Sequence, residues 1–198
     1  MNIFITWTSK WIWNFLKKNL QKEYNIFDIS GRSECDISNF QQLKKYLQTK
    51  IPKDIVFDVL VLNAGFGLFW KFEDFNFENY QSLMNTNLLG NIAILKFLEK
   101  NLYSKTKIIF IWSIVSKKFI KGASVYQASK FGLRGLAWGL KAEWKKVFII
   151  NPKIVVNTDF HKWKIYINPK WEKTNMESIY ETIKNILNGK EKRFEIDI

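Results

Sequence analysis

The sequence predicts an α/β fold, in which a doubly wound parallel β-sheet carries helices on both faces. Two observations predict it. Short apolar runs alternate with amphipathic segments of about 10 or more residues, which is the pattern of successive β-α-β units. Polar or turn-forming residues directly follow several of the runs, at the strand ends where such sheets bind ligands. The 198 residues contain no internal repeat, low-complexity tract or linker, so we expect a single domain over residues 1–198.

The expected strands are short apolar runs, and the expected helices are longer segments with an apolar face. In chain order, the strands cover Asn2–Thr6, Tyr24–Ile29, Ile55–Leu62, Lys107–Trp112, Val147–Ile150 and Arg193–Ile198. The helices cover residues 12–22, 38–48, 77–101, 123–143 and 176–187, and residues 151–175 are rich in loops. Ser38 is expected to cap the second helix, because a serine hydroxyl can accept a hydrogen bond from a free N–H of the first turn.

Composition and charge argue against several classes of protein. Lys and Arg number 31 against 18 Asp and Glu, a net charge of +13, but the lysines are spread over every segment. We interpret them as a solvated surface and expect neither a nucleic-acid nor a membrane partner. No apolar stretch suits a membrane span or a secretory signal, so a cytoplasmic protein is expected. Cys35 is the only cysteine and His161 the only histidine, so neither a disulfide nor a metal site is expected.

Tyr126 and Lys130 carry the first chemical signal. They lie four residues apart in an expected helix and therefore project from the same face. A nearby ammonium favours the phenolate and lowers a tyrosine pKa that is ordinarily about 10. A phenol tuned in this way can exchange a proton with a substrate hydroxyl. Because such pairs are common on solvated helix faces, the signal is informative only together with a nucleotide-binding half of the chain.

The order of motifs along the chain resembles the short-chain dehydrogenase/reductase family. Asn63-Ala64-Gly65 follows an expected strand, Asn87 lies in the next helix, and Ser113 follows a later strand, thirteen residues before Tyr126-x-x-x-Lys130. The resemblance covers about residues 2–160. It implies a single Rossmann-type domain that interconverts a carbonyl and an alcohol by hydride transfer with NAD(P). An epimerase or dehydratase of the wider family is the alternative with the same fold.

The resemblance implies a role for each catalytic residue. Tyr126 would be the general acid/base, protonating a carbonyl oxygen in reduction or accepting a hydroxyl proton in oxidation. Lys130 would lower the pKa of Tyr126 and hold the nicotinamide ribose. Ser113 would hydrogen-bond the substrate oxygen, and Asn87 would position a water in the proton relay. The substrate would be a small carbonyl compound or alcohol of unspecified identity, and a homo-oligomer is left open.

The expected phosphate-binding turn departs from the family. The segment Thr6-Trp7-Thr8-Ser9-Lys10-Trp11-Ile12-Trp13 keeps the spacing Thr-Gly-x-x-x-Gly-x-Gly, with tryptophan at each glycine position. Glycine at these positions permits a tight turn and close approach to a pyrophosphate, and three indoles would fill that space. The chain has nine tryptophans and nine glycines, and about 4.5% glycine is below the usual ~7%.

We therefore hypothesise that UGA codons read as glycine in the source organism were rendered as tryptophan. UGG codons at positions 7, 11 and 13 would refute this. The alternative is a genuine aromatic and basic interfacial helix. In that case the dinucleotide site is blocked, and a non-catalytic RNA- or membrane-binding protein becomes the better interpretation.

The residues at the end of the second strand bear on the choice of cofactor. Aligned from Thr6, Ser30 and Arg32 fall beside the adenosine ribose, and an arginine there suits the 2′-phosphate of NADP. NADP is therefore favoured over NAD, although Asp28 would restore a preference for NAD if the register shifted. The resemblance assigns cofactor contacts to Thr6, Trp7, Ser9, Lys10, Trp11, Ile12, Trp13, Ser30, Arg32, Asp36, Ile37, Asn63, Ala64, Gly65, Tyr126, Lys130 and Thr158.

Overall fold

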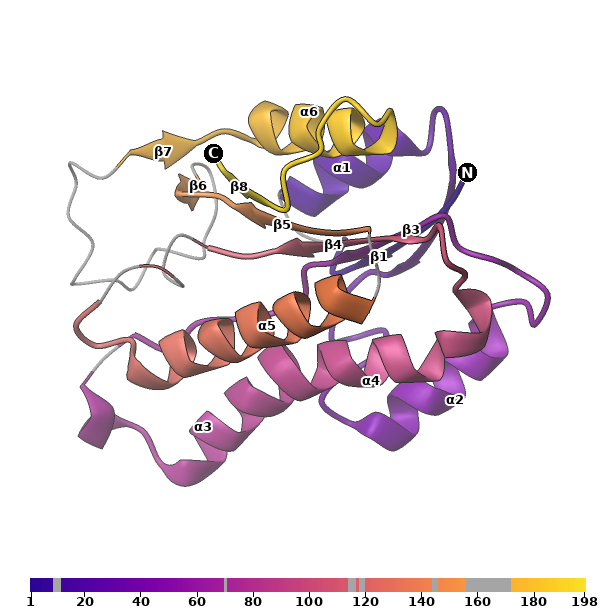
Figure 1. Cartoon of the computed structure of the whole chain (residues 1–198). Helices are drawn as coiled ribbons and strands as arrows, with labels where there is room; N and C mark the ends of the chain where they lie inside the picture. The colour runs from indigo at the N-terminus through magenta and orange to yellow at the C-terminus, as the bar shows by residue number, and fades with distance from the viewer. Residues whose placement is uncertain (9–11, 70, 114–116, 118–119, 144–145, 156–171) are drawn as a thin grey trace.

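The computed structural model contains a central sheet with helices on both faces (Figure 1). It describes residues 1–198 except for 9–11, 70, 114–116, 118–119, 144–145 and 156–171, and the side chains of residues 12 and 13 are also outside the description. The expected doubly wound fold is confirmed. Its strands lie close to the apolar runs of the sequence, because those runs are long enough for strands and too short for helices.

Six parallel strands form the sheet, in the order β2-β1-β3-β4-β5-β8. They are β1 (Asn2–Thr6), β2 (Asn25–Ile29), β3 (Val59–Leu62), β4 (Lys107–Ile111), β5 (Val147–Asn151) and β8 (Glu195–Asp197). The chain runs outward from β1 in both directions, so the order reverses between β1 and β3. Ligands bind beyond the carboxyl ends of the strands at such a switch point. A separate pair of two-residue strands is formed by β6 (Ile154–Val155) and β7 (Lys173–Thr174).

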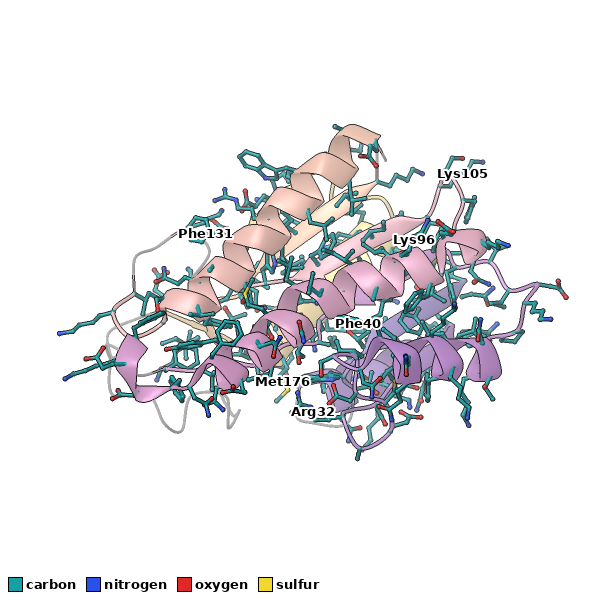
Figure 2. All side chains as sticks on the ribbon, turned by 90° about the horizontal axis from the view of Figure 1, so that it is seen from below. Arg32, Phe40, Lys96, Lys105, Phe131 and Met176 are labelled. Carbon is teal, nitrogen blue, oxygen red and sulfur yellow. The ribbon has the colours of Figure 1, made fainter. Side chains whose placement is uncertain are left out.

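Helices cover both faces of the sheet (Figure 1). They are α1 (Ile12–Leu20), α2 (Phe40–Lys50), α3 (Phe77–Met84), α4 (Gly90–Phe97), α5 (Ser124–Glu143) and α6 (Met176–Leu187), with a π-helix at Asn85–Leu89 and 3-10 turns at Phe72–Asp74 and Glu99–Asn101. Helices α1 and α6 lie on one face. Helices α2, α4 and α5 lie on the other, which Figure 2 shows from below.

The alternation of side chains along β1 explains this division of the core. Ile3 and Ile5 point to the face of α1 and α6, where they pack with Ile183, whereas Phe4 points to the face of α2, α4 and α5. All three strand residues are at most 1% exposed. Burying each side chain contributes about 1.5–3 kcal/mol, so β1 is held from both sides.

Two differences from the expected element boundaries are explained by hydrogen bonds. Asn39, not Ser38, caps α2, because the Ser38 hydroxyl donates to Asp36 Oδ1 at 2.6 Å, while Asn39 accepts from the Gln42 N–H at 3.1 Å. The apolar run 55–62 is strand only from Val59. Before that point, the backbone N–H groups of residues 55 and 57 bond to carbonyls outside the sheet.

Candidate active site

Thr6 joins the carboxyl ends of β1 and β3 at the switch point. Its buried Oγ1 accepts hydrogen bonds from the N–H groups of Asn63 and Ala64, both at 2.9 Å, and Asn63 Nδ2 donates back to the Thr6 carbonyl at 3.4 Å. A valine here would have the same shape without the acceptor. The hydroxyl thus fixes where the chain leaves β3 and enters Asn63-Ala64-Gly65.

Trp7, directly after Thr6, has a backbone φ of 59°, which lies in the left-handed region. Among the described residues it is the only non-glycine residue there, and the region is uncommon for bulky side chains. The indole packs against the core on the α2, α4 and α5 face, and its buried Nε1 has no hydrogen-bond partner among the described residues. Glycine adopts this conformation freely. The backbone at position 7 therefore has a conformation that glycine adopts more readily than tryptophan, and the recoding itself stays a hypothesis.

The rest of the expected phosphate-binding turn is only partly described. Ser9, Lys10 and Trp11 lie outside the described residues, as do the side chains of Ile12 and Trp13. Helix α1 begins at Ile12. Thr158, the expected contact of the nicotinamide amide, also lies outside the described residues.

The carboxylate of Asp28 on β2 is engaged within the protein. It accepts hydrogen bonds from Lys17 Nζ on α1, at 2.9 Å to each oxygen, and from the Thr8 hydroxyl. The side chain of Asp28 is 15% exposed. Asp28 thus ties the end of β2 to α1 and to the turn after β1.

Ser30, just beyond β2, is engaged by a second carboxylate. Its N–H and hydroxyl donate to Glu34 Oε2 at 2.7 and 2.6 Å, and the Tyr46 hydroxyl donates to Glu34 Oε1 at 2.6 Å. Burial by itself would raise the pKa of Glu34, but these hydrogen bonds outweigh it and hold the pKa below its usual value. Glu34 therefore stays ionised beside the expected ribose position, and the sequence analysis did not single it out.

Arg32 lies in the same segment and connects three parts of the fold (labelled in Figure 2). Its Nε pairs with Asp36 at 3.2 Å, its Nη2 donates to Thr86 Oγ1 at 3.3 Å, and its guanidinium lies 5.6 Å from the centre of the Phe66 ring. The side chain is still half exposed.

Ile37, by contrast, is buried in the core against Gly90, where a Cβ would come within 3.0 Å of its side chain. Its side chain thus has a packing role at the start of α4.

Asn87 lies in the π-helix that interrupts the expected helix 77–101. π-helical turns are rare and occur frequently at functional sites. The buried side chain donates to the Phe66 carbonyl at 2.8 Å and to Ser129 Oγ at 3.1 Å, and it accepts from the Phe66 N–H at 2.9 Å. Asn87 therefore joins the loop after β3 to α5, and its side chain is occupied by these three bonds.

Asn91, one turn after Asn87, is a site residue that the sequence analysis missed. Its Nδ2 donates to the carbonyls of Asn87 at 2.7 Å and Ala64 at 3.3 Å. The side chain is 2% exposed, and its Oδ1 has no hydrogen-bond partner among the described residues. The spacing Asn87-x-x-x-Asn91 is the signal that could have revealed it, because residues four apart share a helix face.

Tyr126 and Lys130 lie together in the first turns of α5 and are 2% and 5% exposed. Lys130 Nζ is 5.6 Å from the centre of the Tyr126 ring, and the Ser113 side chain hydrogen-bonds the phenol. A Cβ built on Gly65 would lie 3.4 Å from Lys130 Nζ and 3.1 Å from Asn87 Oδ1. The fold therefore brings Ser113 and Lys130 to Tyr126, and it brings Lys130 and Asn87 to Gly65.

The ionisation of this pair differs from the sequence-based expectation. Burial raises the pKa of Tyr126 well above its ordinary value, and the hydrogen bond with Ser113 only partly offsets this. Burial also lowers the pKa of Lys130 to about 8. The expected lowering of the tyrosine pKa by Lys130 is therefore wrong here. Desolvation disfavours the charged form of both groups.

The part of the chain that the structure describes contains no group of three His, Cys, Asp or Glu side chains placed to hold a metal ion. Within the same residues, no helix combines the length and apolar character that crossing a membrane would need.

A six-stranded parallel sheet whose strand order reverses between β1 and β3, with helices on both faces (Figure 1), is a doubly wound architecture of the Rossmann type. The family model for short chain dehydrogenases matches residues 9–164. The chain therefore belongs to the short-chain dehydrogenase/reductase family.

Individual relatives agree with this assignment. The chain is 31% identical to sepiapterin reductase of Chlorobaculum tepidum over 147 residues, which cover 72% of this chain and 57% of that protein. It spans about half the length of the first curated relatives it matches.

Solved structures share the fold. A short chain dehydrogenase family protein from Francisella tularensis superimposes with a TM-score of 0.83 at 21% identity, covering all of this chain and 96% of that one. An alcohol dehydrogenase of Thermococcus sibiricus in complex with 5-hydroxy-NADP gives 0.79 at 20% identity, covering all of this chain and 95% of that one.

Proposed function

We propose that the chain is an NAD(P)-dependent oxidoreductase that interconverts a carbonyl and an alcohol at Tyr126. The observation that carries the proposal is the convergence of Ser113 and Lys130 on Tyr126, with Lys130 also beside Gly65. Ser113 follows β4, Tyr126 and Lys130 belong to α5, and Gly65 lies in the loop after β3. Chance proximity of these residue types does not explain why each matches its position in the family's order of motifs.

In this proposal, Tyr126 donates its phenolic proton to the substrate carbonyl oxygen. Its raised pKa keeps the phenol protonated at neutral pH, which favours reduction, whereas oxidation of an alcohol requires the phenolate and therefore a higher pH. Ser113 holds the substrate oxygen through its hydroxyl, and stabilises the charge that develops there. Asn87 holds the loop after β3 against α5, so its role is to position these groups.

At Gly65, the described residues leave space for a nicotinamide dinucleotide. The absence of a side chain at Gly65 leaves space beside Lys130, which a Cβ would narrow to 3.4 Å. Thr6, residues 63–65 and Lys130 would hold the cofactor along this edge. The bound nicotinamide supplies or accepts the hydride.

We propose NADP as the preferred cofactor. Asp28, which would favour the ribose hydroxyls of NAD, is bound by Lys17 and Thr8, whereas Arg32 keeps half of its side chain exposed. A guanidinium suits a phosphate better than an uncharged hydroxyl.

Cofactor titration tests this function. The chain would be made with glycine at positions 7, 11 and 13, and NADPH and NADH would be titrated against it by fluorescence and thermal shift. We expect NADPH to bind more tightly than NADH, and Arg32→Ala to remove the difference. Absence of any response would contradict the enzyme proposal and favour a non-catalytic protein. Cofactor that stays bound through purification would favour an epimerase or dehydratase.

Substitution of Tyr126 tests the mechanism. Tyr126→Phe should reduce turnover by at least about 100-fold, because a positioned acid contributes about 10²–10⁴-fold, and should leave NADPH binding unchanged. Stopped-flow or steady-state NADPH oxidation with a broad panel of carbonyl compounds measures the first effect, and fluorescence titration measures the second. Retained turnover in the phenylalanine variant would remove Tyr126 from the proposed role.

A further inference from the structure

Tyr126 is almost completely enclosed although its proposed function requires contact with a substrate. It forms a small core cluster with Leu83 and Ala123. The partly buried side chains packed against this cluster are also apolar: Phe66, Leu68, Phe69, Met84, Ile120 and Val125. This apolar shell is the main reason that burial raises the pKa of the phenol.

Phe69 contacts the Tyr126 ring directly. The ring centres are 5.0 Å apart and the planes are inclined by 60°, a tilted arrangement that aromatic pairs favour. Phe69 lies in the segment after β3 that leads to the first 3-10 turn, and residues 63–69 of this segment belong to neither a helix nor a strand. Its ring can therefore move without unfolding a helix or a strand.

Gly67 fixes the place of this ring. A Cβ on Gly67 would lie 2.0 Å from Cε2 and 2.3 Å from Cζ of Phe69, so any other residue would push the ring away. The backbone φ of Gly67 is not positive, so alanine fits the backbone and conflicts only with the ring. Gly67 and Phe69 thus act as a pair in which the glycine leaves room for the ring over Tyr126.

We propose that Phe69 selects the substrate of this site: its ring covers Tyr126 and gives way to carbonyl compounds with an aromatic or bulky apolar substituent next to the carbonyl. The proposal rests on the proposed function of Tyr126. The displaced Phe69 ring then packs on such a substituent, which replaces the contact that the ring loses with Tyr126, whereas a small polar substituent offers the ring no such contact. A charged or strongly polar substituent would be desolvated among Leu83, Met84 and Val125 without a partner of its own, which is unfavourable.

Nitration of tyrosine tests the cover without relying on activity. The full chain and its Phe69→Ala and Gly67→Ala variants would be treated with tetranitromethane, and nitrated peptides quantified by mass spectrometry. Nitration requires the phenolate. Exposure of Tyr126 to solvent lowers its pKa, and a lowering by about one unit raises the phenolate fraction about tenfold. We therefore expect Tyr126 to react about tenfold faster in both variants. Phe72→Ala is the matched control, because Phe72 stacks on Tyr80 and should leave Tyr126 unchanged. Equal nitration of Tyr126 in all four proteins would contradict the proposal that the Phe69 ring covers Tyr126.

Turnover of two ketones tests the selection. With glycine at positions 7, 11 and 13, kcat/KM would be measured for acetophenone and for pyruvate. We expect a preference for acetophenone that Phe69→Ala reduces by about 2- to 12-fold, the equivalent of one aromatic contact. An unchanged preference in a variant whose Tyr126 is nitrated faster would overturn the selection and leave the proposed function intact. If nitration responds as expected but the parent chain reduces no carbonyl compound, the proposed function fails, and the selection with it, while the cover stands.

Discussion

Tyr126 and Lys130 are both almost fully buried, so desolvation dominates their ionisation. The phenol remains protonated through neutral pH and the lysine loses its proton more easily than usual. A buried ammonium with a lowered pKa also makes the free energy of unfolding depend on pH. Because the folded pKa of Lys130 is about 8 against 10.5 ordinarily, the unfolded chain binds more protons between these values, and stability rises with pH in that window.

Lys130→Met tests this account of the buried lysine. Removing the buried charge should increase the free energy of unfolding at pH 7 by up to about 3 kcal/mol, and the gain should shrink as the pH rises from 8 towards 10. Urea unfolding of both proteins at pH 7, 8, 9 and 10 measures the difference. A gain that does not depend on pH would mean that packing of the methionine, not loss of the charge, explains it.

Substitution of Trp7 tests whether the backbone at this position favours glycine. Trp7→Gly and Trp7→Ala both remove the indole, but only alanine retains a Cβ in the left-handed backbone, at a cost of about 1–2 kcal/mol. The glycine variant should therefore be the more stable of the two by about this amount in urea unfolding. At an ordinary strand or helix position the order is reversed. A more stable alanine variant would contradict the backbone argument.

At the scale of elements, the site depends on how the loop after β3 is attached. At the start of this loop, Thr6 on β1 accepts a hydrogen bond from the Ala64 N–H, and Asn91 donates one to the Ala64 carbonyl. Asn87 in the π-helix accepts a hydrogen bond from the Phe66 N–H. The loop then continues to Phe69 over Tyr126. Its first residues are therefore attached to rigid elements, whereas the proposed cover lies further along, where the chain has no regular structure.

Substitution of Thr6 measures the first of these attachments. Thr6→Val leaves two backbone N–H groups of Asn63 and Ala64 without their acceptor, and each such loss costs about 1–3 kcal/mol. We expect a loss of at least about 2 kcal/mol in the free energy of unfolding. Thr6→Ser keeps the hydroxyl and is the control, with a smaller loss from the missing methyl. Equal losses in both variants would assign the effect to packing.

At the scale of the whole molecule, the sheet joins distant parts of the sequence. β1, near the start of the chain, lies between β2 and β3, while β8 pairs with β5 at the opposite edge. Lys107 Nζ, at the start of β4, donates to the Ile186 and Leu187 carbonyls at the end of α6. These connections support the proposal of a single domain over residues 1–198.

A single domain predicts one cooperative unfolding transition. Far-ultraviolet circular dichroism, which follows the helices, and tryptophan fluorescence, which follows the core, should give the same urea midpoint and slope. Two separated transitions, or midpoints that differ between the probes, would show that part of the chain unfolds independently.

The sequence by itself determined the family, the order of strands and helices, and the candidate residues from Asn63 to Lys130. Local patterns suffice for these, because strand length, helical periodicity and motif spacing are written in consecutive residues. Tertiary structure decided what neighbours do to those residues. Burial reversed the expected pKa shift of Tyr126, and Lys17 on α1 donates hydrogen bonds to the Asp28 carboxylate on β2. Each of these depends on groups that only folding brings together, so no pattern of consecutive residues could have indicated it.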